Sequence, residues 1–262
     1  MKETKVGFIG VGNMGSALAR AVSRAGYTVL LCDRDEEKAR HLALELGGVA
    51  SSLADIEKEA DYVFLGIKPA GLSTVTDELK KALSKKTVIS MLAGVSVADV
   101  SKAIGTKVIR IMPNTSVGCG EGMVLWCAED SVIEAERVEF ESIMSKCGRL
   151  DLIPESMIDA ATAISGCGPA FVYMFIEALA DGGVRCGIPR DKAMTYACQT
   201  LIGAAKNALV SQKQPGELKD AVCSPGGSTI EGVRALEANG MRSAVIEAVI
   251  ASFEKTKELG KK

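Results

Sequence analysis

Apolar runs recur along the first 154 positions of the chain, and amphipathic segments separate the early ones. Several runs are apolar almost throughout, as in strands that are covered on both faces of a sheet. We expect strands at residues 6–9, 28–32, 62–66, 87–91, 107–111, 123–127 and 149–152. The segments between the early runs have the apolar spacing of helices, and we place them at residues 14–24, 36–46, 53–59 and 71–83. This alternation predicts an α/β fold with a parallel, doubly wound sheet.

The pattern changes after residue 154, where no further strand is expected. Helical segments follow one another, with Pro and Gly between them. We place these helices at residues 156–164, 170–180, 190–211, 217–222, 229–238 and 242–259. The chain is therefore predicted to have two domains, an α/β domain at 1–154 and an all-helical domain at 155–262. The segment 170–176 is apolar on all sides, which is typical of a helix buried on most faces, so we expect a homo-oligomer.

Composition excludes several classes of partner. The chain has 262 residues, of which 47% are hydrophobic and 24% charged, as in ordinary globular proteins. A net charge of −2 and only 4% aromatic residues give no reason to expect binding to nucleic acid or to an anionic membrane. The longest uncharged stretch, residues 160–176, is short for a membrane span and is interrupted by Gly and Pro. We therefore expect no membrane segment.

Few side chains are available for acid–base or metal chemistry. The single histidine, His41, lies in a strongly helical run and is expected on an exposed or half-exposed helix face. Its placement argues against a Ser-His-Asp triad and against most His-ligated zinc sites. The eight cysteines form no C-x-x-C pair, and no signal peptide is expected before residue 6. Free thiols in a reducing cytoplasm, without a metal site, are the simplest interpretation.

The first candidate site is a glycine-rich turn at the end of the first predicted strand. Gly10, Gly12 and Gly15 form a G-x-G-x-x-G pattern, and Asn13 and Met14 lie between the last two glycines. The pattern follows a strand and opens a helix, which is the context of a dinucleotide-binding fold. The first two glycines permit the tight turn and close approach to a pyrophosphate, and the third permits helix–strand packing. The helix N-terminus then offers its N–H groups to the phosphates.

The end of the second strand carries two opposing signals about the cofactor. Asp33 can accept hydrogen bonds from the adenosine ribose hydroxyls, which favours NAD(H). Arg34 follows at once, and its guanidinium can stack on adenine or pair with the 2′-phosphate of NADP(H). The choice between NADH and NADPH stays open at this point.

Further cofactor contacts are expected after the later strands, because ligands of such sheets lie beyond the carboxyl ends of the strands. Asn114 could donate to the nicotinamide ribose or carboxamide, although an Asn after Pro also forms turns. Lys68 could likewise be a solvated lysine before a helix. The residues that we predict to contact the cofactor at this edge are Ile67, Lys68, Pro69, Ala93, Gly94, Met112 and Asn114.

The second candidate site is a glycine loop in the helical half of the chain. Gly226 and Gly227 break the chain, and Ser228 is predicted to cap the next helix, with Glu231 completing a capping box. A glycine-flanked helix N-terminus of this kind suits a carboxylate. An ordinary helix–helix turn is the structural alternative.

Four segments resemble the signature of pyrroline-5-carboxylate reductases. They are 112–115 (MPNT), 164–171 (ISGCGPAF), 177–183 (EALADGG) and 218–229 (LKDAVCSPGGST). The resemblance runs along the whole chain, and the later segments are far more specific than the glycine-rich turn.

The resemblance implies a Rossmann-like N-terminal domain and a C-terminal all-α dimerisation domain like that of 6-phosphogluconate dehydrogenase. It implies the reduction of 1-pyrroline-5-carboxylate to L-proline with NADP(H) or NAD(H). It also implies a homodimer with interleaved helices, and assembly of five dimers into decamers. By the match, amides at Gly226, Gly227 and Ser228 hold the substrate carboxylate, Ser224 opens the loop, and the Thr229 hydroxyl faces the ring nitrogen. Animal members often carry a glutamate near the position of Gln212, so one acidic contact is absent here.

Such a reaction asks little of side chains, because a cyclic iminium is already electrophilic and the cofactor supplies the hydride. Two alternative functions are compatible with parts of the pattern. A β-hydroxyacid dehydrogenase has a similar layout but uses a lysine early in the helical domain, and no lysine occurs between Lys146 and Lys192. A non-catalytic dinucleotide sensor would not need the second anion-binding loop.

Overall fold

A computed structural model describes residues 4–68, 71–72 and 76–259. One eight-stranded sheet, in the order β3-β2-β1-β4-β5-β6-β7-β8, forms the first part of the chain. Its strands are β1 (Lys5–Ile9), β2 (Thr28–Cys32), β3 (Val49–Ala50), β4 (Tyr62–Leu65), β5 (Thr87–Ser90), β6 (Val108–Pro113), β7 (Gly122–Ala128) and β8 (Gly148–Leu152). The strand order reverses between β1 and β4, where sheets of this type bind their ligands. All seven predicted strands are present, and the two-residue edge strand β3 was not predicted.

The sheet is not parallel throughout, so this part of the prediction was wrong. Strands β3 to β6 pair in parallel, but β7 pairs antiparallel to β6, with Ile111 opposite Trp126. Only residues 114–121 connect β6 to β7. A parallel crossover needs about a dozen residues or more, so this connection can only form an antiparallel turn. Strand β8 again pairs in parallel with β7.

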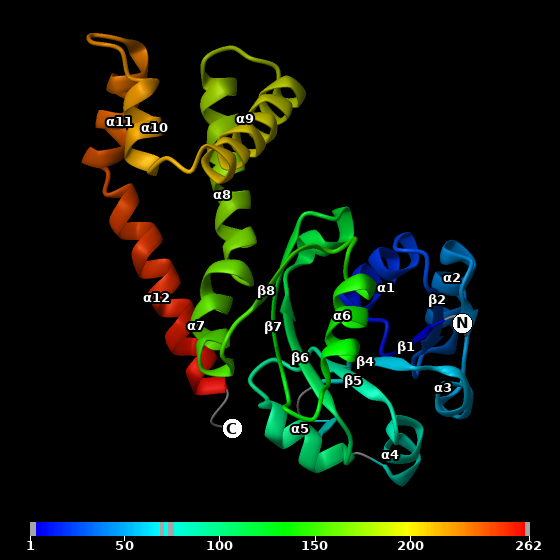
Figure 1. Ribbon diagram of the computed structural model, residues 1–262. Coiled ribbons are helices and arrows are strands. Elements are labelled where there is room, and N and C mark those ends of the chain that lie inside the picture. Colours follow the sequence, from blue (N-terminus) through cyan, green and yellow to red (C-terminus); the bar gives the residue numbers. More distant parts are fainter. Residues whose placement is uncertain (1–3, 69–70, 73–75, 260–262) are drawn as a thin grey trace. The chain divides into compact units, whose positions relative to one another are not determined.

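Helices cover both faces of the sheet (Figure 1). One face packs against α1 (Asn13–Arg24), α2 (Glu36–Leu46) and α6 (Glu134–Ile143). The other packs against α3 (Leu53–Glu59), α4 (Asp77–Leu83), α5 (Val97–Ile104) and α7 (Glu155–Ser165). Within the predicted helix 71–83, the α-helix begins at Asp77, where Thr76 is the N-cap and accepts from the N–H of Leu79.

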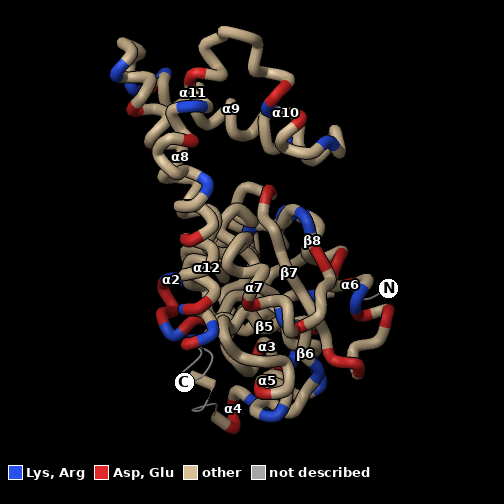
Figure 2. The backbone as a smooth tube through the Cα atoms, turned by 90° about the vertical axis from the view of Figure 1, so that its left-hand side faces the viewer, with Lys and Arg blue, Asp and Glu red and all other residues tan. Residues whose placement is uncertain are grey.

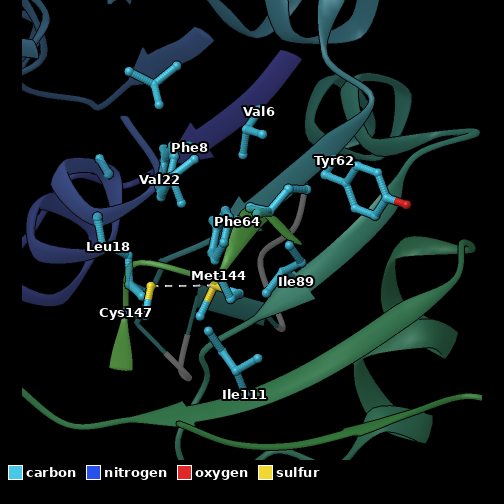
Figure 3. Packing of buried hydrophobic residues seen from close by; sticks show 14 of the residues in the cluster. Val6, Phe8, Leu18, Val22, Tyr62, Phe64, Ile89, Ile111, Met144 and Cys147 are labelled. Atoms are coloured by element: carbon cyan, nitrogen blue, oxygen red, sulfur yellow. Dashed lines mark hydrogen bonds between the residues drawn. The ribbon is translucent and has the colours of Figure 1, made fainter. Parts of the chain in front are cut away.

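The first face carries the aromatic centre of the core. Phe8 of β1 stacks on Phe64 of β4, with ring centroids 4.5 Å apart, and both side chains are fully buried (Figure 3). Adjacent parallel strands place these two residues opposite each other. The contact therefore holds β1 and β4 together next to the point where the strand order reverses.

Helix α7 is fastened to β6 by a buried cation. Arg110 of β6 has a side chain that is 5% exposed, and it donates to Glu155 over 2.9 Å and to Asp159 over 3.3 Å. Ile158, between these two acidic residues, is fully buried against the sheet. Helix α7 thus belongs structurally to the sheet.

This anchoring shifts the boundary between compact units. One unit runs up to Cys167 and includes the stretch from Ser252 onward, and the other is Gly168–Ala251. The compact units thus divide after Cys167, whereas the predicted functional division at 154/155 stays a prediction. Pattern alone cannot show that helix α7 packs on the preceding sheet.

The second unit is entirely helical, as predicted. It contains α8 (Gly168–Arg185), α9 (Arg190–Ser211), α10 (Pro215–Ala221), α11 (Ser228–Ala238) and the first part of α12 (Met241–Leu259). Its only cluster of buried residues among those described is small, with Ala180 of α8 packed against Ala193 and Ala197 of α9. Large apolar side chains on these helices are exposed in the single chain, among them Tyr173, Met174, Ile202, Leu209, Val210, Val245 and Ile246. Helices this apolar and this open need a further covering surface.

One described stretch, Glu155–Arg185, is long and apolar enough to cross a membrane, judged by length and composition alone. Within it, 11% of the apolar 18-residue segment is buried. A single such stretch is weak evidence, and this one is divided by a turn at Gly166 and Cys167 between α7 and α8. Basic and acidic residues are intermixed along the described chain (Figure 2).

Candidate active site

At two positions of the first candidate site, the neighbouring backbone lies so close that only glycine fits. Gly10 has φ +95°, and a Cβ there would lie 2.5 Å from the carbonyl oxygen of Gly66. A Cβ on Gly15 would lie 2.3 Å from the carbonyl oxygen of Gly10. The turn after β1, the start of α1 and the end of β4 therefore approach one another more closely than any side chain allows.

The third glycine leaves space instead. Gly12 is the N-cap of α1, and a Cβ there would meet nothing within 4 Å. No side chain caps this helix, and its first turn holds no acidic residue. The first N–H groups of α1, at Asn13 and Met14, thus begin an uncapped helix with room before it. These residues fit the pyrophosphate of a dinucleotide, because such a helix end attracts anions.

Asp33 connects the end of β2 to this turn. Its Oδ2 accepts a hydrogen bond from the N–H of Val11 over 2.7 Å, and its Oδ1 accepts from the N–H of Asp35 over 3.0 Å. A hollow of about 260 Å³ lies beside it. Its lining residues are Cys32, Asp33, Glu36, Ala39, Arg40, Ala50, Ser51 and Ser52. The carboxyl ends of β2 and β3 and the start of α2 therefore form the expected place for an adenosine ribose.

Sequence reasoning missed Ser51 and Ser52 as part of this hollow. They directly follow β3, whose two residues are both exposed and carry no strand pattern. The signal that could have found them is the capping sequence of the next helix, in which Ser52 and Asp55 form a capping box.

The other cofactor residues predicted at this edge lie after β4, β5 and β6, except Met112, which lies within β6. Ile67 is half-buried and Lys68 exposed, and Ala93 and Gly94 form a turn. Pro69 lies outside the described residues. All four described positions are at the carboxyl ends of their strands, as predicted.

Asn114 and Met112 both make structural contacts, and Asn114 forms the turn that was the alternative interpretation of this residue. Met112 is 8% exposed and belongs to the core on the α7 side of the sheet. The side-chain oxygen of Asn114 accepts from the N–H groups of Ser116 and Met123, over 3.2 and 3.3 Å. Its amide nitrogen donates to the carbonyl of Ser165 over 2.9 Å. Direct cofactor contact by these two residues stays a prediction.

The second candidate site is an exposed loop between α10 and α11. Gly226 has φ +68°, and the N–H of Gly227 donates to the carbonyl of Ser224 over 3.0 Å. The prediction that Ser228 caps α11 was wrong, because Gly227 is the N-cap and no side chain caps the helix. Glu231 pairs with Arg234 over 2.9 Å instead of closing a capping box. The cap therefore lies one residue earlier than predicted. Gly227 has the extended backbone of an N-cap, and Ser228 is already the first residue of the helix.

The missing cap favours anion binding at this loop. Ser224, Gly226, Ser228 and Thr229 are all exposed. Ser228 and Thr229 are the first two residues of an 11-residue helix. Their N–H groups precede the first intrahelical hydrogen bonds, so they can donate to a carboxylate. The structure places the whole predicted substrate set on this loop of the second unit.

Other chemistry is sparse in the described residues. His41 is exposed on α2, as predicted. No group of three or more His, Cys, Asp or Glu among the described residues could hold a metal ion. All eight cysteines are free. Burial raises the pKa of Cys127 to about 11 and that of Cys147 to about 12, which keeps these thiols protonated and unreactive.

Comparison with known proteins settles the family. The model for pyrroline-5-carboxylate reductase dimerisation matches residues 155–259, and the model for coenzyme F420-dependent NADP oxidoreductases matches residues 5–94. The pyrroline-5-carboxylate reductase of Methanosarcina acetivorans is 42% identical, with 100% of both chains covered. That of Escherichia coli is 38% identical over 99% of both chains. The chain belongs to the pyrroline-5-carboxylate reductase family.

Solved structures agree with this assignment. The Plasmodium falciparum pyrroline carboxylate reductase with NADP bound matches with a TM-score of 0.86 and 33% identity, covering 99% of each chain. The enzyme from Streptococcus pyogenes matches with a TM-score of 0.87 and 33% identity, covering 98% of this chain and 100% of that one. These matches confirm the predicted fold class, a Rossmann-like sheet followed by a helical dimerisation region.

Family membership also confirms the predicted activity and cofactor. The chain is an NAD(P)H-dependent oxidoreductase that reduces 1-pyrroline-5-carboxylate to proline. It acts on a small molecule and forms a dimer through its helical region. The dimer explains why the second unit leaves so many large apolar side chains exposed in the single chain.

Proposed function

We propose that the loop Ser224–Thr229 binds the carboxylate of 1-pyrroline-5-carboxylate and that Thr229 acts on its ring nitrogen. The observation that carries this proposal is the uncapped N-terminus of α11 behind an exposed glycine turn. The N–H of Gly227 already donates to Ser224. The N–H of Gly227 is therefore used within the turn. The N–H groups of Gly226 and Ser228 are the main donors to the carboxylate.

Thr229 is the one residue of the loop that we assign to the chemistry. Its hydroxyl can hydrogen-bond to the ring nitrogen and favour the protonated, electrophilic imine. An unperturbed hydroxyl is a poor proton donor, so its role is to orient the ring and to stabilise charge rather than to act as a strict general acid. The other loop residues hold the substrate in place, which lowers the entropy cost of the reaction.

The cofactor supplies the hydride from its nicotinamide ring when it is bound. The residues that would hold it are those of the first unit. The N-terminus of α1 at Gly12, Asn13 and Met14 receives the pyrophosphate, and Asp33 the adenosine ribose. Gly10 and Gly15 permit the tight turn. The remaining residues of the proposed cofactor site are Arg34, Ile67, Lys68, Pro69, Ala93, Gly94, Met112 and Asn114.

Three broader proposals go with this function. Residues 1–154 form the cofactor domain and residues 155–262 the substrate-binding and dimerisation domain, a division supported by the start of the dimerisation model at residue 155. Five dimers assemble into a decamer, as the resemblance to the family implies. The enzyme works in the cytoplasm, which is supported by eight unpaired cysteines. Mass measurement in solution tests the decamer.

Absorbance at 340 nm with added 1-pyrroline-5-carboxylate tests the activity. We expect oxidation of the reduced cofactor only when the imine is present. Thr229→Ala should lower kcat by about ten- to a hundredfold without abolishing turnover. Thr195→Ala, on the exposed surface of α9, is the matched control and should leave kcat unchanged. An unchanged kcat in Thr229→Ala would remove Thr229 from the mechanism.

A second pair of variants tests the backbone amide as the carboxylate donor. Ser228 is the first residue of α11, where proline is well tolerated, and Gly227 has the extended conformation (ψ 166°) that a residue before proline prefers. Ser228→Pro therefore removes the N–H and keeps the helix. We expect it to raise KM for the imine by about tenfold or more, whereas Ser228→Ala should not. Equal KM values in the two variants would show that this amide does not bind the substrate.

A further inference from the structure

We infer that this enzyme prefers NADH to NADPH, and that Asp33 and the hollow beside it determine the preference. The inference rests on the proposed function of the first unit as the cofactor domain. It concerns the 2′ position of the adenosine ribose, which carries a hydroxyl in NADH and a phosphate in NADPH. The sequence alone left this choice open, since Asp33 and Arg34 favour opposite answers.

The orientation of Asp33 is fixed by the backbone. Each carboxylate oxygen already accepts one N–H, from Val11 at 2.7 Å and from Asp35 at 3.0 Å. An ionised carboxylate can accept about four hydrogen bonds, so each oxygen keeps one free lone pair. Two free acceptors on one rigid group match the two donors of a ribose 2′,3′-diol. A 2′-phosphate offers acceptor oxygens there and carries negative charge.

Charges around the hollow oppose a phosphate. Asp33 and Glu36 both line it, and Arg40 is the one basic residue in the lining. Arg40 donates to Glu36 over 3.0 Å and to Glu37 over 2.7 Å, so two carboxylates already share its charge. A 2′-phosphate would therefore meet the two acidic side chains of Asp33 and Glu36. The guanidinium of Arg40, the one basic group there, is already paired with Glu36 and Glu37.

The hydroxyl groups of the lining are engaged as well. Ser51 donates from its hydroxyl to the carbonyl of Val49 over 3.2 Å, and Ser52 donates to Asp55 over 2.7 Å. Serine hydroxyls that bind a phosphate must donate to it. Both hydroxyls would have to give up these bonds to donate to a phosphate.

Arg34 is the residue that could counter this preference. It is exposed and does not line the hollow. An exposed arginine contributes little to an ion pair in water, because it must be ordered and is screened by salt. Its contribution is thus expected to be smaller than that of the fixed carboxylate.

Titration of the enzyme with NADH and with NADPH, followed by nicotinamide fluorescence without imine, tests the inference. We expect NADH to bind at least tenfold more tightly. Asp33→Asn keeps an acceptor oxygen for the N–H of Val11 and removes the charge, so it should reduce the ratio of the two affinities by about tenfold. Asp35→Asn removes the same charge outside the hollow and keeps a good N-cap for α2, so the ratio should stay unchanged.

Two results would overturn the inference. One is NADPH binding as tightly as NADH in the unmodified enzyme, with the NADPH affinity lost in Arg34→Ala. The other is an unchanged affinity ratio in Asp33→Asn. Should Asp33→Asn fail to fold, Glu36→Gln provides the same test from the other acidic residue of the hollow. Because these titrations contain no imine, a failure of the proposed activity would leave their outcome unaffected, and the two failures are distinguishable.

Discussion

The side-chain amide of Asn114 donates a hydrogen bond to the carbonyl oxygen of Ser165 over 2.9 Å. Asn114 directly follows β6, and Ser165 is the last residue of α7. The same strand holds the start of α7 through Arg110 and Glu155. Helix α7 is thus fixed at both ends to one strand, and the second unit begins three residues after Ser165.

Replacement of Asn114 should destabilise the first unit. Asn114→Ala leaves three backbone groups without their partner, at Ser116, Met123 and Ser165. The side chain is 9% exposed, so we expect the free energy of unfolding to fall by about 1–3 kcal/mol. Urea denaturation measures the change. Ser165→Ala is the control, because the bond uses its backbone carbonyl, and it should have little effect. Equal stability of both variants would show that water replaces these bonds at no cost.

Two glycine variants should separate folding from cofactor binding. Gly15→Ala places a Cβ 2.3 Å from the carbonyl oxygen of Gly10, and overpacking of this kind costs about 1–3 kcal/mol. Gly12→Ala meets nothing within 4 Å. It should fold normally but weaken dinucleotide binding by about tenfold or more, since the added methyl occupies the approach of the pyrophosphate.

Thermal denaturation and cofactor titration of both proteins measure this difference. Gly12→Ala should lose affinity with only a small fall in melting temperature, because alanine is a poorer N-cap than glycine. Gly15→Ala should melt much earlier. If Gly12→Ala bound the dinucleotide normally, the pyrophosphate would lie elsewhere.

Most of the sheet could be predicted because its strands are buried on both faces and therefore read as apolar runs. Strand β3 could not, since Val49 and Ala50 are exposed and pair only with β2. The direction of β7 was open to deduction, because the short connection after β6 already excludes a parallel crossover. Helix α7 was recognised, but no local pattern shows that Arg110 would bind two of its acidic residues.

The candidate site was predictable where function depends on backbone shape. Gly10, Gly15 and Gly226 have the positions that their pattern implies, because a tight turn or close approach excludes other residues. The role of Asp33 in holding Val11 was not predictable, since it depends on the distance between two loops that are far apart in sequence. The cap of α11 was misplaced by one residue, because Ser228 already has helical backbone, and a serine side chain caps a helix only from the residue just before it.

Acid should destabilise the protein partly through Glu136. Burial acts to raise the pKa of this carboxyl, but hydrogen bonds from Lys107, the N–H of Ile133 and Thr87 outweigh it, so the pKa is lowered in the folded protein. A lowered folded-state pKa adds stability above the unfolded-state pKa. That stability is lost as the pH falls below the ordinary range of a glutamate carboxyl and through the lower folded-state value.

Glu136→Gln tests this sign. We expect the variant to be about 1–2 kcal/mol less stable at pH 7, and the difference from the unmodified protein to shrink toward pH 3. Urea midpoints at both pH values provide the measurement. Glu134→Gln, at an exposed position in the first turn of the same helix, controls for the change in helix charge. A difference that grows at low pH would contradict the assignment.

Thiol reactivity should follow burial in the native protein. Cys119 and Cys186 are exposed and Cys147 is fully buried. Cys147 lies 3.8 Å from the sulfur of Met144 (Figure 3). With a pKa of about 12, Cys147 has roughly one thiolate in ten thousand molecules at pH 8. Timed alkylation with iodoacetamide at pH 8, read by peptide mass spectrometry, should label Cys119 within minutes and Cys147 only after unfolding in urea. Early labelling of Cys147 without urea would mean that α6 and the start of β8 open far more often than a buried core allows.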